Sequence, residues 1–209
     1  MDRTLIAVYA RAPVPGAAKT RLIPVLGAEG AAALHARLVE RTLGEAARAG
    51  LGPVELWCAP DDTHAFFARC AARFGVGLKP QARGDLGARM AATIEDGLAR
   101  AGAVLIVGSD IPALDAMHLR RAREALETSE AVFIPAEDGG YVLAGLARPR
   151  PVLFQEIAWG GPEVMAQTRA RAAAHGMRIA ELDSLWDLDR PEDLLRLPPE
   201  LLAGLPAPR

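Results

Sequence analysis

The chain has 209 residues, of which 51% are hydrophobic and 24% are charged, and its formal net charge at pH 7 is -2. This length is enough to bury a full core as one domain, and the charge balance excludes a broad basic face for nucleic acid or for a membrane surface. Cys58 and Cys70 have no metal-ligand spacing around them, which excludes a zinc site or a disulfide framework and favours a reducing cytoplasm.

The first two thirds of the chain alternate between strand and helix patterns. Short apolar runs rich in β-branched residues predict buried strands at 4–10, 53–58, 103–108 and 130–135. Helical patterns lie at 28–49, 62–74, 86–101 and 115–127, the second of them capped by Asp61. The alternation predicts βαβ units and a doubly wound α/β fold, with a mainly parallel sheet and helices on both faces.

The last third departs from this alternation. Gly139-Gly140 and the apolar residues 141–147 predict a strand that pairs as an edge or in a small β-hairpin, followed by a helix from Pro162 and a strand at 177–182. We expect one domain over residues 1–197 and a Pro- and Leu-rich tail over 198–209 that frays. Because no apolar run approaches the roughly 20 residues of a membrane span, we expect no membrane partner.

Ligands of open parallel sheets bind beyond the carboxyl ends of the strands, so the loops after the strands are the places to search. The first loop runs from Arg11 through Gly16 to Lys19-Thr20-Arg21 and is stiffened by two prolines. It is either a solvated surface loop or a cationic loop that binds phosphate. A P-loop is excluded because Ala18 stands where that motif requires glycine before the lysine.

The second loop opens a helix and carries Gln81, Gly84, Asp85 and Gly87, with Arg89 in the first turn. Glycines at a helix start allow close backbone approach, and the helix N-terminus with an arginine favours an anion or the polar edge of a base. Asp85 is an ordinary N-cap. The other four residues are candidates for binding a nucleotide.

The third loop, Gly108-Ser109-Asp110, ends the most apolar of the predicted strands. A carboxylate there is costly unless it is paired or bound to a metal, and Mg²⁺ is typically held by one or two carboxylates together with substrate phosphates. Asp110 is therefore the best candidate metal ligand. The alternative is a turn aspartate that stabilises the following Ile-Pro bend.

The fourth and fifth loops add acids. Glu137 and Asp138 precede a glycine pair and Tyr141, where they are placed either for an acceptor substrate or simply in a hairpin turn. Asp187 and Asp189 precede a helix begun by Pro191; one can reach the metal while the other caps the helix.

The remaining polar residues indicate no further chemistry. The four histidines share no metal-ligand spacing, and we assign them no catalytic role. Ser109 lacks the Gly-x-Ser-x-Gly elbow, so a hydrolase triad is not supported.

Six segments, ARAPVPGAAKTRL, GDLGARM, GSDIPAL, DGGYVLAGL, WGGPEV and WDLDRPEDL, occur in an order and spacing that resemble one family. It is the family of small GT-A-fold transferases associated with radical-SAM and selenodomain proteins, also described as arsenosugar-pathway glycosyltransferases and DUF2064-like. The family belongs to the nucleotide-diphospho-sugar transferase superfamily and is similar to the molybdenum-cofactor and phospholactate guanylyltransferases. The resemblance, which covers most of the chain, implies a GT-A, or nucleotide-diphospho-sugar transferase, fold and a nucleotide-activated donor.

The resemblance also implies roles for particular residues. Lys19 and Arg21 would contact the donor phosphates, Asp110 would bind Mg²⁺ or Mn²⁺, and Asp138 would act on the acceptor. Asp189 is the second candidate metal ligand. The remaining candidate binding residues would line the donor site or, for the last of them, face the acceptor: Arg11, Gly16, Gln81, Gly84, Gly87, Arg89, Ser109 and Tyr141.

Three hypotheses follow for a cytoplasmic protein with a nucleotide-activated donor and a small-molecule acceptor. The leading one is metal-dependent glycosyl transfer from a nucleotide-diphospho-sugar. The second is nucleotidyl transfer with release of pyrophosphate, because Gly108-Ser109-Asp110 supplies only the last acid of the Asp-x-Asp common in glycosyltransferases of this fold. The third is a non-catalytic nucleotide-binding module.

Overall fold

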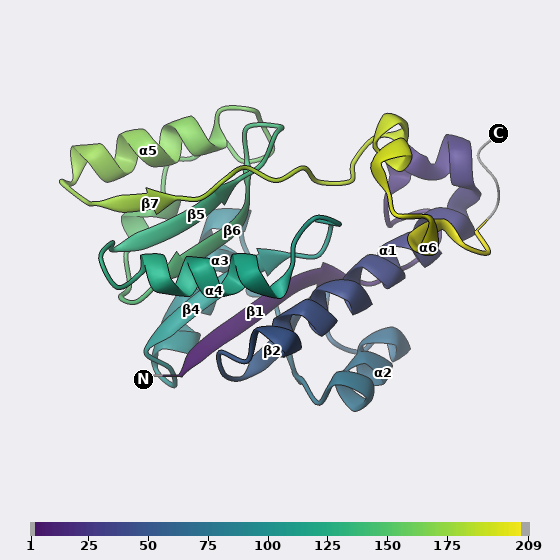
Figure 1. Cartoon of the computed structure of the whole chain (residues 1–209), viewed down its shortest axis with the longest axis horizontal. Coiled ribbons are helices and arrows are strands. Elements are labelled where there is room, and N and C mark those ends of the chain that lie inside the picture. Colours follow the sequence, from purple (N-terminus) through teal and green to yellow (C-terminus); the bar gives the residue numbers. More distant parts are fainter. Residues whose placement is uncertain (1–2, 206–209) are drawn as a thin grey trace.

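The computed structural model describes residues 3–205, which form a seven-stranded sheet covered by helices (Figure 1). The strand order is β3-β2-β1-β4-β6-β5-β7. The strands, in chain order, are β1 Thr4–Arg11, β2 Val54–Ala59, β3 Gly77–Pro80, β4 Ala103–Gly108, β5 Ala131–Pro135, β6 Tyr141–Leu146 and β7 Ile179–Glu181.

The sheet is mainly parallel. β1 pairs in parallel with both β2 and β4, β2 pairs in parallel with β3, and β5 pairs in parallel with β7. β6 alone runs antiparallel, against β4 on one side and β5 on the other. The carboxyl ends of β1 to β4 therefore meet at one edge, where the first three candidate loops leave the sheet.

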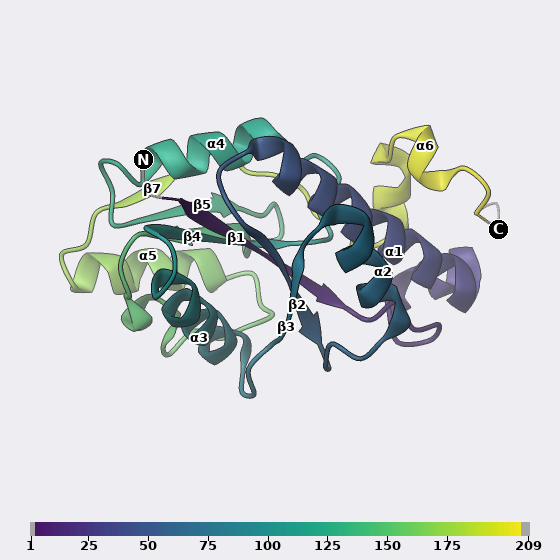
Figure 2. The same ribbon diagram turned by 90° about the horizontal axis from the view of Figure 1, so that it is seen from below.

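Helices cover both faces, as the alternation predicts (Figure 2). On one face lie α1 Ile23–Ala49, α2 Ala65–Phe74 and α4 Ala116–Ala125; on the other lie α3 Leu86–Leu98 and α5 Val164–Ala174. Buried side chains such as Leu43 and Phe67 fill the first layer, and Ile94 and Met165 fill the second. This burial of one apolar stripe per helix holds the parallel strands in register.

Two strands differ from expectation. β6 forms the predicted hairpin with β5, but it lies inside the sheet between β4 and β5 and not at an edge. Its residues 142–146 are buried, which agrees with a continuous apolar run. β3 was not predicted because its four residues include Lys79 and Pro80; it is an edge strand, where a proline costs no ladder hydrogen bond.

The helix caps are mostly as expected. Asp85 accepts a hydrogen bond from the Ala88 amide at the start of α3, and Asp115 accepts from the Met117 and His118 amides at the start of α4. The predicted cap of α2 is wrong: the helix begins at Ala65 with His64 as its cap, and Asp61 accepts from Thr63 in the turn before it.

The C-terminal segment is more ordered than predicted. After the 3-10 helix η3 at Pro191–Arg196, the short helix α6 Pro199–Leu202 packs beside the start of α1 (Figure 1). Leu194, Leu197 and Leu201 are buried there, and Arg37 donates to the Leu201 carbonyl at 2.8 Å. Of the tail expected to fray, residues 206–209 lie outside the described part of the chain.

The segment Thr20–Ala49, which comprises the 3-10 helix η1 Thr20–Leu22 and α1, is long and apolar enough to cross a membrane by length and composition alone. The expectation that no segment approaches such a span is therefore wrong. Half of its most apolar window is buried inside the protein, and Gly27 interrupts it with a non-helical backbone at φ 71°. Leu34, Leu38 and Leu43 of α1 are core residues, at 0–1% exposure.

Candidate active site

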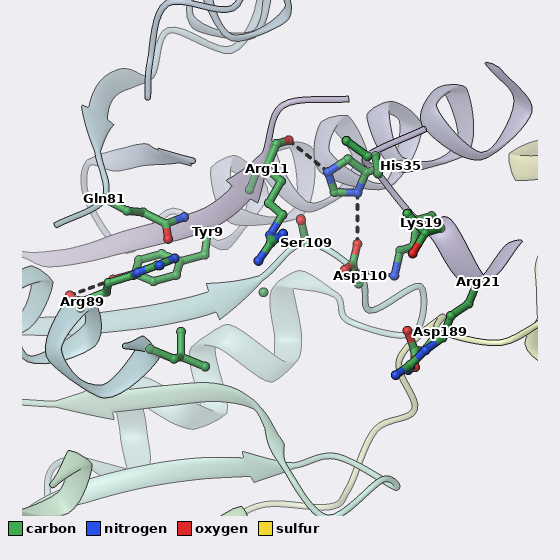
Figure 3. Close-up of a pocket in the computed structure, with 16 residues that line it drawn as sticks. Tyr9, Arg11, Lys19, Arg21, His35, Gln81, Arg89, Ser109, Asp110 and Asp189 are labelled. Atoms are coloured by element: carbon green, nitrogen blue, oxygen red, sulfur yellow. Dashed lines mark hydrogen bonds and ion pairs between the residues drawn. The ribbon is translucent and has the colours of Figure 1, made fainter. Parts of the chain in front are cut away.

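A cleft of about 570 Å³ lies beyond the carboxyl ends of β1, β3 and β4. The three loops predicted to meet at this edge line it, together with the loop before η3. The structure brings together these predicted residues: Arg11, Lys19, Arg21, Gln81, Arg89, Ser109, Asp110 and Asp189 (Figure 3). Tyr9, Leu86 and His35 also line the cleft and were not predicted.

Lys19 and Asp110 form the centre of the cleft. The Lys19 ammonium lies 2.9 Å from Oδ2 of Asp110 and also donates to the Leu188 carbonyl. Lys19 adopts a left-handed backbone at φ 48°, which turns the chain from the loop into η1 and directs its side chain inward, where only 8% of it is exposed. The Asp110 side chain is 39% exposed and faces the cleft.

His35 of α1 supports the same carboxylate from the buried side. Its Nδ1 lies 3.2 Å from Oδ1 of Asp110, and its Nε2 lies 3.0 Å from the carbonyl oxygen of Arg11. The ring is buried, with 4% of the residue exposed. The sequence-based interpretation left His35 without a role. Its helical spacing with Leu34 and Leu38 marks the buried face of the helix, so a polar side chain there was the available signal.

The electrostatic balance at Asp110 favours the ionised carboxylate. Burial raises the pKa of this group, but the Lys19 charge and the contacts with His35 outweigh burial and hold the pKa well below its usual range. The Leu188 amide donates to the Asp110 backbone carbonyl at 2.8 Å, which ties this loop to the segment that carries Asp187 and Asp189.

Charged groups gather at one end of the cleft. The Arg21 guanidinium pairs with Asp189, and Arg11 projects into the cleft beside Ser109 (Figure 3). The other end carries uncharged groups and Arg89. Gln81 donates from Nε2 to the Trp57 carbonyl at 2.9 Å, and Arg89 donates from Nε to the Gly84 carbonyl at 3.0 Å. The cleft is therefore polarised along its length.

A second cavity of about 240 Å³ adjoins the cleft and shares Asp110, Gly108 and Leu86 with it. Asp138, Tyr141 and Asp187 line this cavity together with Trp159. Burial first, and then the charge of Asp138, raise the pKa of Asp187 to about 6. Asp138 also accepts from the Gly140 amide at 2.9 Å, so it stabilises the turn as well as lining the cavity.

Three predicted residues line neither the cleft nor the second cavity. Gly16 and Gly84 have positive φ values of 83° and 113° and shape the loops that carry the cleft residues. Gly87 packs against Phe154 and Trp159: a Cβ at this position would lie 2.3 Å from the Phe154 carbonyl oxygen. Its lack of a side chain is therefore required by packing between α3 and the loop that carries Trp159.

The Tyr141 hydroxyl is buried without a hydrogen-bond partner among residues 3–205, and burial raises its pKa. Its ring packs at 5.0 Å from Phe133 and 6.1 Å from Trp159, measured between ring centroids. Tyr141 thus forms part of the aromatic wall of the second cavity, on the side predicted to face an acceptor.

No group of three or more His, Cys, Asp or Glu side chains forms a closed metal cage among the residues that the structure describes. An open site agrees with the chemistry of Mg²⁺ and Mn²⁺, which take carboxylate oxygens together with phosphate oxygens and water. Asp110 lines both cavities and Asp189 lines the cleft, so two carboxylates of the kind that such an ion takes face the donor side.

The structure has relatives among solved transferases. A protein of Desulfovibrio desulfuricans G20, provisionally named a nucleotide-diphospho-sugar transferase, is 28% identical over 91% of this chain and 84% of that chain, with a TM-score of 0.83. A nucleotidyl transferase from Methanothermobacter thermautotroptrophicus is 16% identical over 95% of this chain and 97% of that chain, with a TM-score of 0.61.

A third solved structure is glucosyl-3-phosphoglycerate synthase from Mycobacterium tuberculosis, in complex with Mn²⁺, uridine-diphosphate and glucosyl-3-phosphoglycerate. It is 10% identical over 93% of this chain and 75% of that chain, with a TM-score of 0.56. At these identities, the second and third structures share the fold alone. The expected nucleotide-diphospho-sugar transferase fold is confirmed, and its neighbours include both nucleotidyl and glycosyl transferases.

Comparison with curated proteins by sequence gives no match. The family model described as "Uncharacterized protein conserved in bacteria (DUF2064)" matches residues 42–161, from the middle of α1 through β4 and β6 to the loop that carries Trp159. The match covers more than half of the chain, and the chain therefore belongs to the DUF2064 family.

Proposed function

We propose that this protein is a metal-dependent, cytoplasmic transferase that moves a glycosyl group from a nucleotide-diphospho-sugar to a small-molecule acceptor. The observation that carries the proposal is the polarised cleft, in which Lys19 meets Asp110 beside Arg11 and Arg21. The association with radical-SAM proteins and the arsenosugar pathway, which the sequence motifs imply, is part of the same proposal.

The donor diphosphate would lie at the charged end of the cleft. Lys19, Arg11 and Arg21 supply ammonium and guanidinium donors there, and such groups bind phosphate oxygens with charge-assisted hydrogen bonds. The base would extend toward Gln81 and Arg89 at the other end. Gln81 donates to the Trp57 carbonyl, so its Oε1 remains an acceptor for a base N–H.

A divalent cation would be held by Asp110 with Asp189, the second predicted metal ligand. A bound Mg²⁺ or Mn²⁺ supplies Lewis-acid stabilisation of the diphosphate charge. Lys19 already occupies Oδ2 of Asp110, and His35 contacts Oδ1. The diphosphate would attract the Lys19 ammonium, and this carboxylate would then be available to the cation.

Transfer would take place where the cleft meets the second cavity. The acceptor hydroxyl oxygen forms a bond to the anomeric carbon of the donor, and the bond from that carbon to the diphosphate oxygen breaks. The electron pair leaves with the nucleoside diphosphate, and the hydroxyl proton passes to the Asp138 carboxylate as general base. Lys19 and Arg21 stabilise the charge that develops on the leaving group.

The test is donor turnover by the full chain with Mn²⁺ or Mg²⁺, measured as nucleoside diphosphate released from a panel of nucleotide sugars. Lys19→Ala and Asp110→Asn are expected to lower the rate by about 10² to 10³. Lys79→Ala and Asp183→Asn are matched controls, because Lys79 lies on the edge strand and Asp183 is exposed outside the cleft. Unchanged turnover in both cleft variants would contradict the proposal.

Nucleotidyl transfer is the second candidate, favoured by the single acid in Gly108-Ser109-Asp110. It predicts pyrophosphate release from a nucleoside triphosphate, whereas glycosyl transfer predicts nucleoside diphosphate release from a nucleotide sugar. A non-catalytic binding module would release neither product. In calorimetry, it would bind the nucleotide equally well with and without EDTA.

A further inference from the structure

The second cavity differs in charge from the cleft that it adjoins. Four basic side chains, Arg11, Lys19, Arg21 and Arg89, line the cleft. Among the described residues, no lysine or arginine lines the second cavity, whereas three carboxylates do: Asp110, Asp138 and Asp187. The cleft is therefore suited to binding anions, whereas the adjoining second cavity repels them.

The charges of two of these acids are not neutralised locally. Asp110 is paired with Lys19, but neither Asp138 nor Asp187 forms an ion pair with a residue in the range 3–205.

A hollow that adjoins the second cavity also has more acids than cations in its lining. This hollow, of about 440 Å³, shares Asp138, Asp187, Gly160 and Gly161 with the second cavity. Its lining has five acids, Glu137, Asp138, Asp187, Asp189 and Asp193, against three arginines, Arg21, Arg190 and Arg196. Arg21 is paired with Asp189, and Arg196 is paired with Glu137 at 2.8 Å. Two of the three cations are therefore neutralised by two of the five acids.

The rest of the cavity wall is apolar. Ile111, Val142, Val164 and the rings of Tyr141 and Trp159 surround the carboxylates. Such a wall fits a small molecule with a carbon skeleton against the rings and with hydroxyl or ammonium groups toward the acids.

We propose that the acceptor is a small hydroxyl compound that is uncharged or positively charged, and that phosphorylated or carboxylated acceptors are excluded by Asp138 and Asp187. This inference rests on the proposed function, since it specifies the acceptor of that reaction. It also separates the two transfer reactions: glycosyl transfer needs only a hydroxyl, whereas nucleotidyl transfer to a phosphate acceptor would place an anion among these carboxylates.

The experiment measures binding of three probes that share one hydroxymethylbenzene skeleton and differ only in charge. They are 4-(aminomethyl)benzyl alcohol, 1,4-benzenedimethanol and 4-(hydroxymethyl)benzoate. The full chain is saturated with its best-binding nucleoside diphosphate and Mg²⁺, and probe binding is followed by ligand-observed NMR up to millimolar concentration. We expect the ammonium probe to bind at least about tenfold more tightly than the carboxylate probe, with the neutral probe between them.

The variants Asp138→Asn and Asp187→Asn keep the side-chain shape and remove the charge. Each is expected to reduce the difference between the ammonium and carboxylate probes by about threefold or more, whereas the exposed control Asp183→Asn leaves it unchanged. Equal or tighter binding of the carboxylate probe, an unchanged difference in both variants, or no binding of any probe overturns the inference.

Nucleotide binding is measured separately by thermal shift with nucleoside diphosphates and Mg²⁺. Failure of every nucleotide to bind contradicts the proposed function itself, in which case the probes are tested on the free protein with the same expected order. The two failures are therefore distinguishable. A failure of nucleotide binding concerns the donor cleft, whereas a failure of the expected probe order concerns the charge of the acceptor cavity.

Discussion

His35 bridges two loops of the cleft, because its Nδ1 contacts Oδ1 of Asp110 at 3.2 Å and its Nε2 contacts the Arg11 carbonyl oxygen at 3.0 Å. Both ring nitrogens of His35 therefore face oxygen atoms, one from each loop. The imidazole thus acts with Lys19 to hold the Asp110 carboxylate in the cleft.

We predict that His35→Ala lowers the apparent affinity for Mn²⁺, or the turnover, by about 10- to 100-fold, as is usual when a group that orients a metal ligand is removed. A Mn²⁺ titration of donor turnover measures this. His175→Ala is the control, because the His175 ring is exposed outside the cleft and its Nδ1 lies 2.9 Å from the Arg171 carbonyl oxygen of its own helix. An unchanged metal titration in His35→Ala would show that the bridge does not position Asp110.

The lowered pKa of Asp110 makes part of the folding stability dependent on pH. A carboxyl group whose folded pKa lies below its unfolded value of about 3.9 stabilises the fold above that value and loses this contribution as pH falls through the folded pKa. We predict that Asp110→Asn is more destabilising at pH 6 than at pH 3. Denaturant unfolding at both values measures the difference, and Asp183→Asn should show no such dependence. Equal destabilisation by Asp110→Asn at both pH values would be the contrary result.

Gln81 is held by two hydrogen bonds, from its backbone amide to the Cys58 carbonyl and from Nε2 to the Trp57 carbonyl, each at 2.9 Å. We predict that Gln81→Leu weakens binding of the preferred nucleoside diphosphate by about tenfold but leaves pyrophosphate binding unchanged, because only the base would meet Oε1. Calorimetry with both ligands tests this, with the exposed Gln155→Leu as control. Equal loss for both ligands would place Gln81 at the phosphates.

The two cysteines are expected to be unreactive in the folded protein. Burial, reinforced mainly by nearby acidic charge, raises the pKa of Cys58 to about 12 and that of Cys70 to about 11, so both thiols stay protonated at pH 8. We predict slow reaction with a disulfide reagent such as DTNB in the native state and rapid reaction of both thiols in denaturant. Rapid labelling of the native protein would contradict the burial of these side chains.

Leu201 of α6 is buried against the start of α1, at 8% exposure, whereas Leu195 of η3 is 92% exposed. We predict that Leu201→Ala costs about 2 kcal/mol or more of unfolding free energy, in the lower part of the range for a buried leucine. Leu195→Ala should stay within about 0.5 kcal/mol of the parent. Urea unfolding compares the two, and equal effects would show that α6 adds nothing to the fold.

Much of the fold follows from local pattern. Strands such as Ala103–Gly108 and the amphipathic helix that contains Met90 and Ile94 are visible as apolar runs and stripes, because burial imposes a period that the sequence must display. The caps Asp85 and Asp115 are equally local, since a cap bonds to amides two or three residues away. Strand β3 lacks such a signal because an edge strand buries little.

The sequence by itself determined the doubly wound α/β fold, and the family resemblance implied its transferase form. It also placed Lys19, Arg21, Asp110 and Asp189 at one sheet edge, because parallel strands end together. The tertiary structure alone decided that His35 reaches Asp110 across 75 positions, that β6 lies inside the sheet, and that Asp138 and Asp187 form an acidic cavity beside a basic cleft. The physical reason is that periodicity records which face of an element is buried, whereas long-range contacts depend on how the elements pack.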